Sequence, residues 1–154
     1  MTIDSYSEHA KSPIGKSTYL PPFCIIPKTI RTAVVNAVCD ERVFDINPML
    51  VLSERRYPAL AHARYMVIFL FRVLWGDASW TGAAEREWAS YPQVGLAINR
   101  EHSTAMYGWD RACERFDQDR EYRRMVLAAL DVLDAELPDH ADRIRAVRAK
   151  VGNV

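Results

Sequence analysis

The sequence has few of the residues that form covalent cross-links or metal sites. Its 154 residues include three cysteines, Cys24, Cys39 and Cys113, and no two of them have the Cys-x-x-Cys spacing of zinc and redox sites. An odd number of cysteines at scattered positions does not form the framework of a disulfide-stabilised domain. The four histidines include no pair with the i, i+4 spacing of a helical metal site. We therefore expect reduced cysteines, no metal site and no cofactor.

Long apolar segments are missing as well. The longest apolar run, Met66–Phe71, is far shorter than the roughly 20 residues that a helix needs to cross a bilayer. The first residues, Met1–Lys11, are polar and lack the apolar centre of a signal peptide. We therefore expect a cytoplasmic protein with no membrane partner.

The chain also has no net charge, because twenty basic and twenty acidic side chains cancel. This counts against nucleic-acid binding, since phosphate neutralisation supplies much of the affinity and such domains usually carry excess positive charge. A neutral chain can still carry a local basic patch, so the distribution of charge decides. One such patch is present: between Ser53 and Arg72 there are four arginines and one acid.

Helical periodicity begins only after the first 28 residues. Residues 1–28 contain four prolines and no periodic apolar pattern, which predicts a flexible or loosely docked N-terminal arm. In residues 29–154 apolar side chains recur at helical spacing, which predicts one domain. No segment there alternates in the manner of a strand, so we predict an all-α fold.

The apolar stripes predict six helices, which span approximately residues 29–38, 58–74, 92–98, 103–116, 122–133 and 139–151. Thr29 and Asp139 are the expected N-caps of the first and the last of these helices. We expect the third and fourth helices to cross steeply, with Trp109 buried between them. Trp75–Ser90 is expected to be a loop with one or two helical turns near Ala83–Trp88.

Two motifs that suggest enzymatic chemistry lack its requirements. Gly15-Lys16-Ser17-Thr18 matches the end of a phosphate-binding loop, but that loop needs a glycine where Ala10 stands and a buried strand before it. His102 and Ser103 are adjacent, and neighbouring helical residues point about 100° apart, so they cannot easily share a proton. We therefore predict that the protein is not an enzyme and neither binds nor hydrolyses ATP.

Two other segments have the features of a DNA-binding surface. Ser53–Arg56 precedes the long helix, on whose exposed flank we place Arg64 and Arg72. Downstream, Tyr91–Ile98, a two-residue break and Glu101–Thr104 have the layout of a helix-turn-helix, in which the second helix places its first residues in the major groove. The alternatives are a solvated basic face and a plain helical hairpin whose polar residues are caps.

Four ordered motifs in this region resemble the DNA-binding C-terminal domain of the bacterial replication initiator DnaA. They lie within residues 30–134 and read Leu52-Ser53-x-Arg55-Arg56, Leu60-Ala61-x-Ala63-Arg64, Tyr91-Pro92-x-Val94-Gly95 and Arg100-Glu101-His102-Ser103-Thr104. The resemblance implies a helix-turn-helix domain, similar also to the Trp repressor, with an extra C-terminal helix and without the ATPase part of DnaA. It implies sequence-specific binding of double-stranded DNA at the nucleoid, in control of replication initiation or transcription, with a replication or regulatory protein as a further expected partner.

The resemblance also implies a role for each matching residue. Arg55 and Arg56 belong to a basic loop from which Arg56 enters the minor groove, where arginine favours A·T-rich sequence. The positions of Arg64 and Arg72 bind phosphates, which set register rather than sequence. The resemblance further implies that five residues face the base edges in the major groove, namely Arg100, Glu101, His102, Ser103 and Thr104.

The sequence departs from the family pattern at several positions. Glu101 replaces the usual aspartate, Pro58 replaces a frequent basic residue, and Tyr65 replaces a common phosphate-binding glutamine. The connection Trp75–Ser90 is also longer than the family pattern, and it contains three tryptophans. These tryptophans favour an alternative, a protein-interaction module that keeps the DnaA-like fold and no longer reads DNA.

Overall fold

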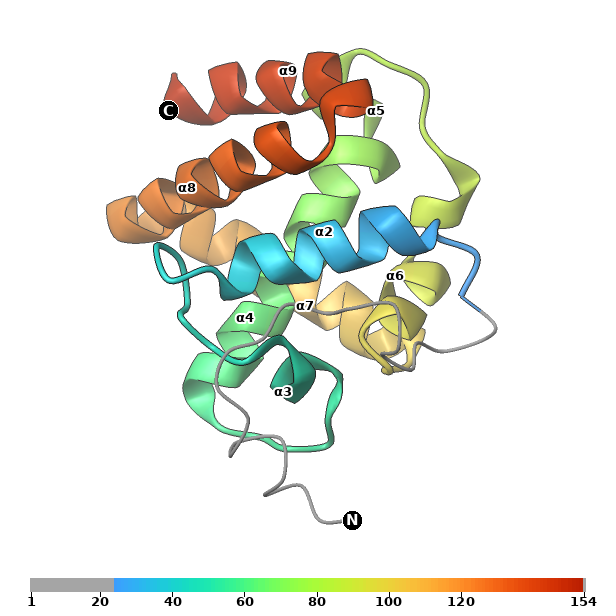
Figure 1. Cartoon of the computed structure of the whole chain (residues 1–154), viewed down its shortest axis with the longest axis vertical. Coiled ribbons are helices and arrows are strands. Elements are labelled where there is room, and N and C mark those ends of the chain that lie inside the picture. Colours follow the sequence, from blue (N-terminus) through green and yellow to red (C-terminus); the bar gives the residue numbers. More distant parts are fainter. Residues whose placement is uncertain (1–23, 154) are drawn as a thin grey trace.

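The computed structural model describes residues 24–153, and every regular element among them is a helix (Figure 1). This confirms the predicted all-α class. In chain order the elements are α2 (Lys28–Cys39), α3 (Pro48–Leu52), α4 (Pro58–Phe71), η1 (Arg72–Gly76), α5 (Ala78–Thr81), η2 (Glu87–Ala89), α6 (Tyr91–Ala97), α7 (His102–Gln118), α8 (Arg120–Glu136), η3 (Pro138–His140) and α9 (Ala141–Gly152).

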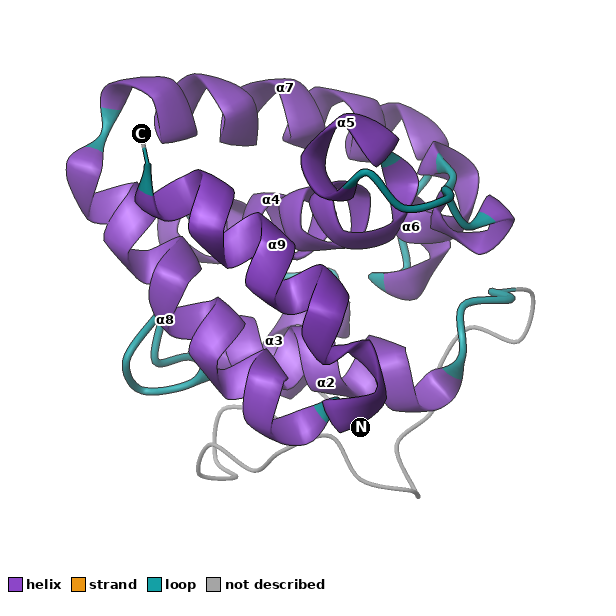
Figure 2. Ribbon diagram, turned by 90° about the horizontal axis from the view of Figure 1, so that it is seen from above, coloured by secondary structure: helices purple, strands orange, loops and turns teal. Residues whose placement is uncertain are grey.

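Helix α4 is the central element of the fold. It contacts α2, α3, α6 and α7, and Figures 1 and 2 show it enclosed by other helices. It continues without a break into the π-helical turn η1. The combined segment Pro58–Gly76 is, by length and composition, apolar enough to cross a membrane, although the run Met66–Phe71 alone is too short. Of the 18 most apolar consecutive residues of this segment, 72% are buried inside the fold. A helix that is apolar on all sides needs such a buried environment.

The folded part of the chain begins earlier than expected. Ile26 is 1% exposed, and the backbone amide of Ile25 donates to Oε1 of Gln93 on α6 at 2.7 Å. Helix α2 starts one residue before Thr29, which therefore lies inside the first turn and is not the N-cap. Cys24 and Ile26 thus pack with the domain, so this part of the arm is docked, which is one of the two forms that the sequence left open.

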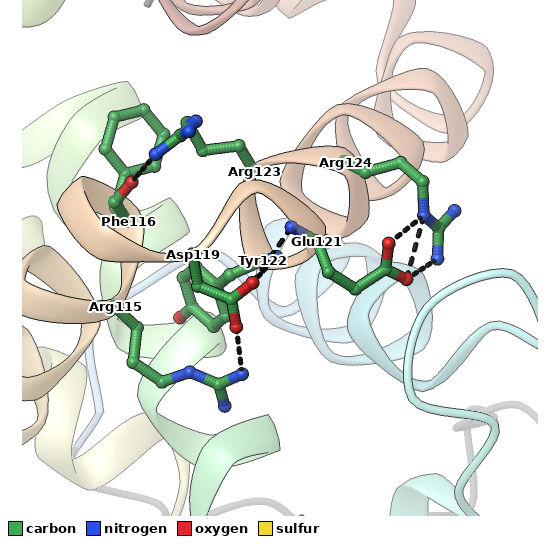
Figure 3. Close-up of polar contacts among 7 residues, drawn as sticks. All are labelled: Arg115, Phe116, Asp119, Glu121, Tyr122, Arg123 and Arg124. Atoms are coloured by element: carbon green, nitrogen blue, oxygen red, sulfur yellow. Dashed lines mark hydrogen bonds and ion pairs between the residues drawn. The ribbon is translucent and has the colours of Figure 1, made fainter.

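Asp119 fixes the turn from α7 to α8. Its carboxylate accepts hydrogen bonds from the backbone amides of Glu121 at 2.9 Å and Tyr122 at 3.3 Å, and it pairs with Arg115 at 2.8 Å (Figure 3). The bond to Arg115 is the main cause that holds the pKa of Asp119 below its usual value. Asp139, the other expected cap, lies inside η3 and does not cap α9.

The tryptophan-rich segment between α4 and α6 covers the core. Trp75 is 1% exposed, and Trp80 and Trp88 are partly buried against the core. The ring of Trp80 packs edge-on against Phe69, with 5.7 Å between centroids. Trp80 also contacts α9, where Nζ of Lys150 lies 5.2 Å from the centroid of the Trp80 ring. The two helical turns here are α5, which lies before the expected stretch Ala83–Trp88, and η2, which overlaps its end. These tryptophans therefore serve packing, and none is among the large exposed apolar side chains of the described surface.

Candidate nucleic-acid interface

A tight turn centred on Asn99 joins α6 to α7. Asn99 has a φ of 59°, the left-handed conformation that often ends a helix. The amide of Arg100 donates to the Gly95 carbonyl at 2.8 Å, and the amide of Asn99 donates to the Leu96 carbonyl at 3.0 Å. A Cβ on Gly95 would lie 2.7 Å from the carbonyl oxygen of Glu101. The angle between α6 and α7 thus depends on a residue that tolerates positive φ and on a glycine.

Helix α7 begins with an exposed and uncapped first turn. Glu101 occupies the N-cap position, but its side chain makes no capping hydrogen bond, and the first turn holds no acid. His102 and Ser103 are exposed, and Thr104 is partly exposed. Because the free N–H groups at a helix start carry partial positive charge, the start of α7 presents polar side chains on an electropositive helix end.

Helix α7 packs directly on α4. A Cβ on Gly108 would lie 2.5 Å from Cδ1 of Ile68 and 2.9 Å from Cδ1 of Tyr65, so a larger residue would force these two side chains to shift. The next residue, Trp109, is partly buried and stacks on Phe69 with 5.5 Å between ring centroids. The prediction that Trp109 is buried between α6 and α7 is therefore wrong, because its aromatic partner belongs to α4.

Arg64 does not lie on an exposed flank of α4, contrary to the expectation from the sequence. It is 5% exposed, and burial is the main cause that lowers its pKa to about 10, with a smaller effect of the charges of Arg100 and Arg56. Its guanidinium donates at 2.7–3.0 Å to four main-chain carbonyls, those of Leu50, Val51, Ser53 and Arg55. Arg64 therefore holds residues 50–55 against α4.

Arg72 is also engaged inside the domain, so its predicted exposure is wrong too. Its Nη1 donates to the Ala89 carbonyl at 3.0 Å, and its guanidinium lies 4.3 Å from the ring centroid of Tyr91, a cation–π distance. Arg72 is partly buried and stands two helical turns from Arg64. Its contacts position the entry into α6 rather than a basic flank of α4.

Arg100 connects the basic loop to the start of α7. Its Nη2 donates at 2.7 Å to the carbonyl of Ser53, which lies 47 positions earlier in the chain and also accepts from Arg64. Desolvation and the charge of Arg56 lower the pKa of Arg100, and the nearby Glu54 opposes this effect. The loop and the start of α7 are therefore one structural unit.

The side chain of Arg56 stands at the centre of the surface that results. Arg56 is exposed and has no hydrogen bond or ion pair with the described residues, whereas Arg55 is partly buried. Two depressions meet at Arg56: a recess of about 340 Å³ between α4 and α7, and a shallower one of about 820 Å³ that extends to the α6–α7 turn. We call this surface the loop–helix face and define it by Arg56, Arg100, Glu101, His102, Ser103 and Thr104.

Two aromatic residues of this surface were not predicted as site residues. Tyr65 and Tyr107 line the smaller recess, with 6.0 Å between their ring centroids. Tyr107 is 56% exposed and follows Thr104 by three positions, which places the two on one side of α7. That spacing was a signal in the sequence. The position of Tyr65 inside the recess depends on how α4 meets α7, which the sequence does not show.

The other reactive groups give no support to catalysis. Within residues 24–153 no group of three His, Cys, Asp or Glu side chains is placed to hold a metal ion. Burial raises the pKa of the Cys39 thiol to about 12, and burial with nearby carboxylates raises that of Cys113 to about 11. Such thiols stay protonated and are poor nucleophiles. The Gly15-Lys16-Ser17-Thr18 motif lies outside the described residues, so the expected lack of ATP binding stays a prediction.

Comparison with protein-family models, curated proteins and solved structures gives no match for this chain. The resemblance to the DnaA C-terminal domain therefore rests on the four motifs alone. The functional interpretation rests on the loop–helix face.

Proposed function

We propose that this protein binds double-stranded DNA sequence-specifically through α6 and α7, arranged as a helix-turn-helix of the DnaA type. The observation that supports this best is the hydrogen bond from Arg100 to the Ser53 carbonyl at 2.7 Å. It brings the exposed Arg56 of the basic loop beside the polar first turn of α7. A protein that enters two adjacent grooves needs such a pairing of a basic arm with the start of a recognition helix.

In this proposal the first turn of α7 enters the major groove. His102 and Thr104 reach base edges, and Glu101 accepts a hydrogen bond from a cytosine amine. Arg56 extends into the adjacent minor groove, where a narrow A·T-rich stretch attracts a guanidinium group. The exposure of these side chains supports the assignment, because base contacts require groups that are not already used inside the protein.

Arg64 and Arg72 act as positioning residues in this proposal and not as phosphate ligands. Their guanidinium groups are directed at main-chain carbonyls of the loop and of the segment before α6. The arginines left at the loop–helix face are Arg56 and Arg100, and they lie beside Glu54 and Glu101. Because the chain as a whole is neutral, non-specific binding should be weak and the specific component easy to resolve at moderate salt.

The biological process that fits this activity is control of replication initiation or of transcription at the nucleoid, with a replication or regulatory protein as a further partner. This part of the proposal rests on the resemblance to DnaA. The tryptophans that favoured a protein-interaction module are used in packing, so we develop DNA binding first.

The test is selection of bound duplexes from a random pool with the intact chain, followed by affinity measurements on the enriched sequence. Arg56→Ala and Thr104→Ala should each reduce the preference for that sequence by roughly 1–3 kcal/mol at the base concerned. Arg124→Ala is the matched control, because Arg124 is exposed on α8 and paired with Glu121 (Figure 3). It should leave the preference unchanged. If no duplex is enriched at low salt, DNA binding is rejected and the protein-interaction module takes its place.

A further inference from the structure

The smaller recess of the loop–helix face is lined by cations and hydroxyl groups. Three arginines line it: Arg56 from the basic loop, Arg64 from α4 and Arg100 from the α6–α7 turn. The first turn of α7 contributes Ser103 and Thr104. Its volume is about 340 Å³, and no carboxylate is among its lining residues. Three arginines therefore share one recess without an acidic side chain in its wall.

The charges of these arginines are not neutralised by their hydrogen-bond partners. Arg64 and Arg100 donate to main-chain carbonyls, which are neutral acceptors. Burial and the charge of Arg56 lower the pKa of both groups, and Glu54 offsets this only for Arg100. The uncapped start of α7 adds a positive helix end at the same place. An anion that binds among these like charges reduces the electrostatic repulsion between them.

We propose that the recess between α4 and α7 binds a phosphate group, held by Arg56 where it passes the backbone toward the minor groove, by the hydroxyl group of Ser103 and by the start of α7. Arginine and hydroxyl donors around a helix start are a favourable environment for phosphate oxygens. Arg64 contributes positive charge rather than hydrogen bonds to the phosphate, because most of its N–H groups already donate to carbonyls of residues 50–55. Where the phosphate belongs to DNA, this inference rests on the proposed function. The recess then makes the contact to the DNA backbone that Arg64 and Arg72 were expected to make.

The recess has room for more than a phosphate group. The rings of Tyr65 and Tyr107 stand at 71° to each other and form its aromatic side. A sugar or base attached to the phosphate can pack against this side. The phosphate can therefore come from the DNA backbone, at the boundary between the two grooves, or from a free nucleotide.

The first experiment is a titration of the intact chain with inorganic phosphate, compared with sodium chloride at equal ionic strength. The readout is the amide NMR signals of Ser103 and Thr104, which should shift and saturate with phosphate only. Arg56→Gln should raise the dissociation constant at least fivefold, and Arg124→Gln should leave it unchanged. Arg56→Gln removes no internal hydrogen bond with the described residues, so folding is preserved. Shifts that do not saturate, or equal curves for wild type and Arg56→Gln, would overturn the phosphate site.

The second experiment distinguishes the two sources of phosphate. If DNA supplies it, a neutral methylphosphonate at one backbone position of the selected duplex should reduce affinity about tenfold for the wild type and hardly at all for Arg56→Gln. If a free nucleotide supplies it, dAMP should saturate at a concentration at least tenfold below that of inorganic phosphate.

The same measurements separate this inference from the proposed function. A chain that binds the selected duplex but shows no saturable phosphate shift keeps its DNA-binding function and loses this site. A chain that saturates with phosphate but binds no duplex keeps the site, with a free nucleotide as its ligand.

Discussion

Replacing Arg64 by alanine should destabilise the domain, because the side chain is part of its interior. The guanidinium satisfies four main-chain carbonyls at 2.7–3.0 Å, and the residue is 5% exposed. A hydrogen bond to a charged group contributes roughly 1.5–3 kcal/mol, and each buried acceptor left unpaired costs roughly 1–3 kcal/mol. Burying the charge opposes these gains, and water can reach some carbonyls once the side chain is gone. The expected loss is therefore roughly 3 kcal/mol of unfolding free energy.

The measurement is equilibrium unfolding in urea, followed by circular dichroism. Arg64→Lys keeps the positive charge but concentrates its donors on one nitrogen, so it should lose roughly 2 kcal/mol. Arg56→Ala is the matched control, because Arg56 is an exposed arginine of the same surface, and its loss should stay within about 0.5 kcal/mol. If Arg64→Ala and Arg56→Ala have the same urea midpoint, the structural role assigned to Arg64 is wrong.

DNA binding gives a second test of the same residue. A phosphate ligand, when removed, lowers the slope of log affinity against log salt by about one and leaves folding stability unchanged. A positioning residue, when removed, reduces stability and the preference for the selected sequence together, because the loop that carries Arg56 loses its support. A reduced salt slope in a fully stable Arg64→Ala protein would return Arg64 to the role of phosphate ligand.

Three further predictions concern the turn beside the site, the α7–α8 turn and the histidine of η3. Asn99→Ala should cost about 1 kcal/mol in urea unfolding, because its φ of 59° disfavours a Cβ without a compensating polar group, whereas Asn99→Gly should be nearly neutral; equal losses would contradict this. Asp119→Ala should cost about 1 kcal/mol through loss of its cap, and an unchanged melting temperature would refute that. Burial is the main cause that holds the pKa of His140 below 6.5; the unfolded chain therefore binds more protons just below that pH, and stability should fall from pH 7 to 5.5. His140→Gln should reduce this loss, and a loss equal to that of the wild type would exclude His140 as its source.

Most of the helices could be predicted from the sequence, because their apolar residues recur with a strong period of 3.6. This holds for α7 and α8, whose inner faces match the expected stripes, whereas α4 is buried on all sides from Met66 to Phe71. The helix ends were less predictable. Thr29 has the right side chain for an N-cap, but the chain enters α2 through Ile26 and Pro27, and packing of Ile26 against the core sets an earlier start. A cap residue competes with tertiary contacts that a local pattern does not contain.

The candidate site was predicted only in part, because Arg72 lies away from it at the entry into α6 and the two tyrosines of the recess were missed. Arg56, Arg100 and the residues Glu101, Ser103 and Thr104 line two adjoining recesses. Arg64 was assigned to an exposed flank because a polar residue on an amphipathic helix normally faces water. Here residues 50–55 fold over that flank and supply carbonyl acceptors, which no spacing within α4 can reveal. The bond from Arg100 to Ser53 spans 47 positions and is equally invisible to a local pattern.

The basic loop is held through its main-chain carbonyl oxygens, which accept hydrogen bonds from Arg64. The use of backbone acceptors determines which substitutions the loop tolerates. Every amino acid carries a backbone carbonyl, so the bonds from Arg64 to Leu50, Val51 and Arg55 do not depend on the side chains at those positions. The exposed tip of the loop is therefore free to vary in sequence while its shape is kept. The donors have no such freedom, because only arginine reaches several carbonyls at once. A variant screen of this region should show tolerance at the exposed loop positions and intolerance at Arg64, so new base preferences can arise in the loop without loss of its framework.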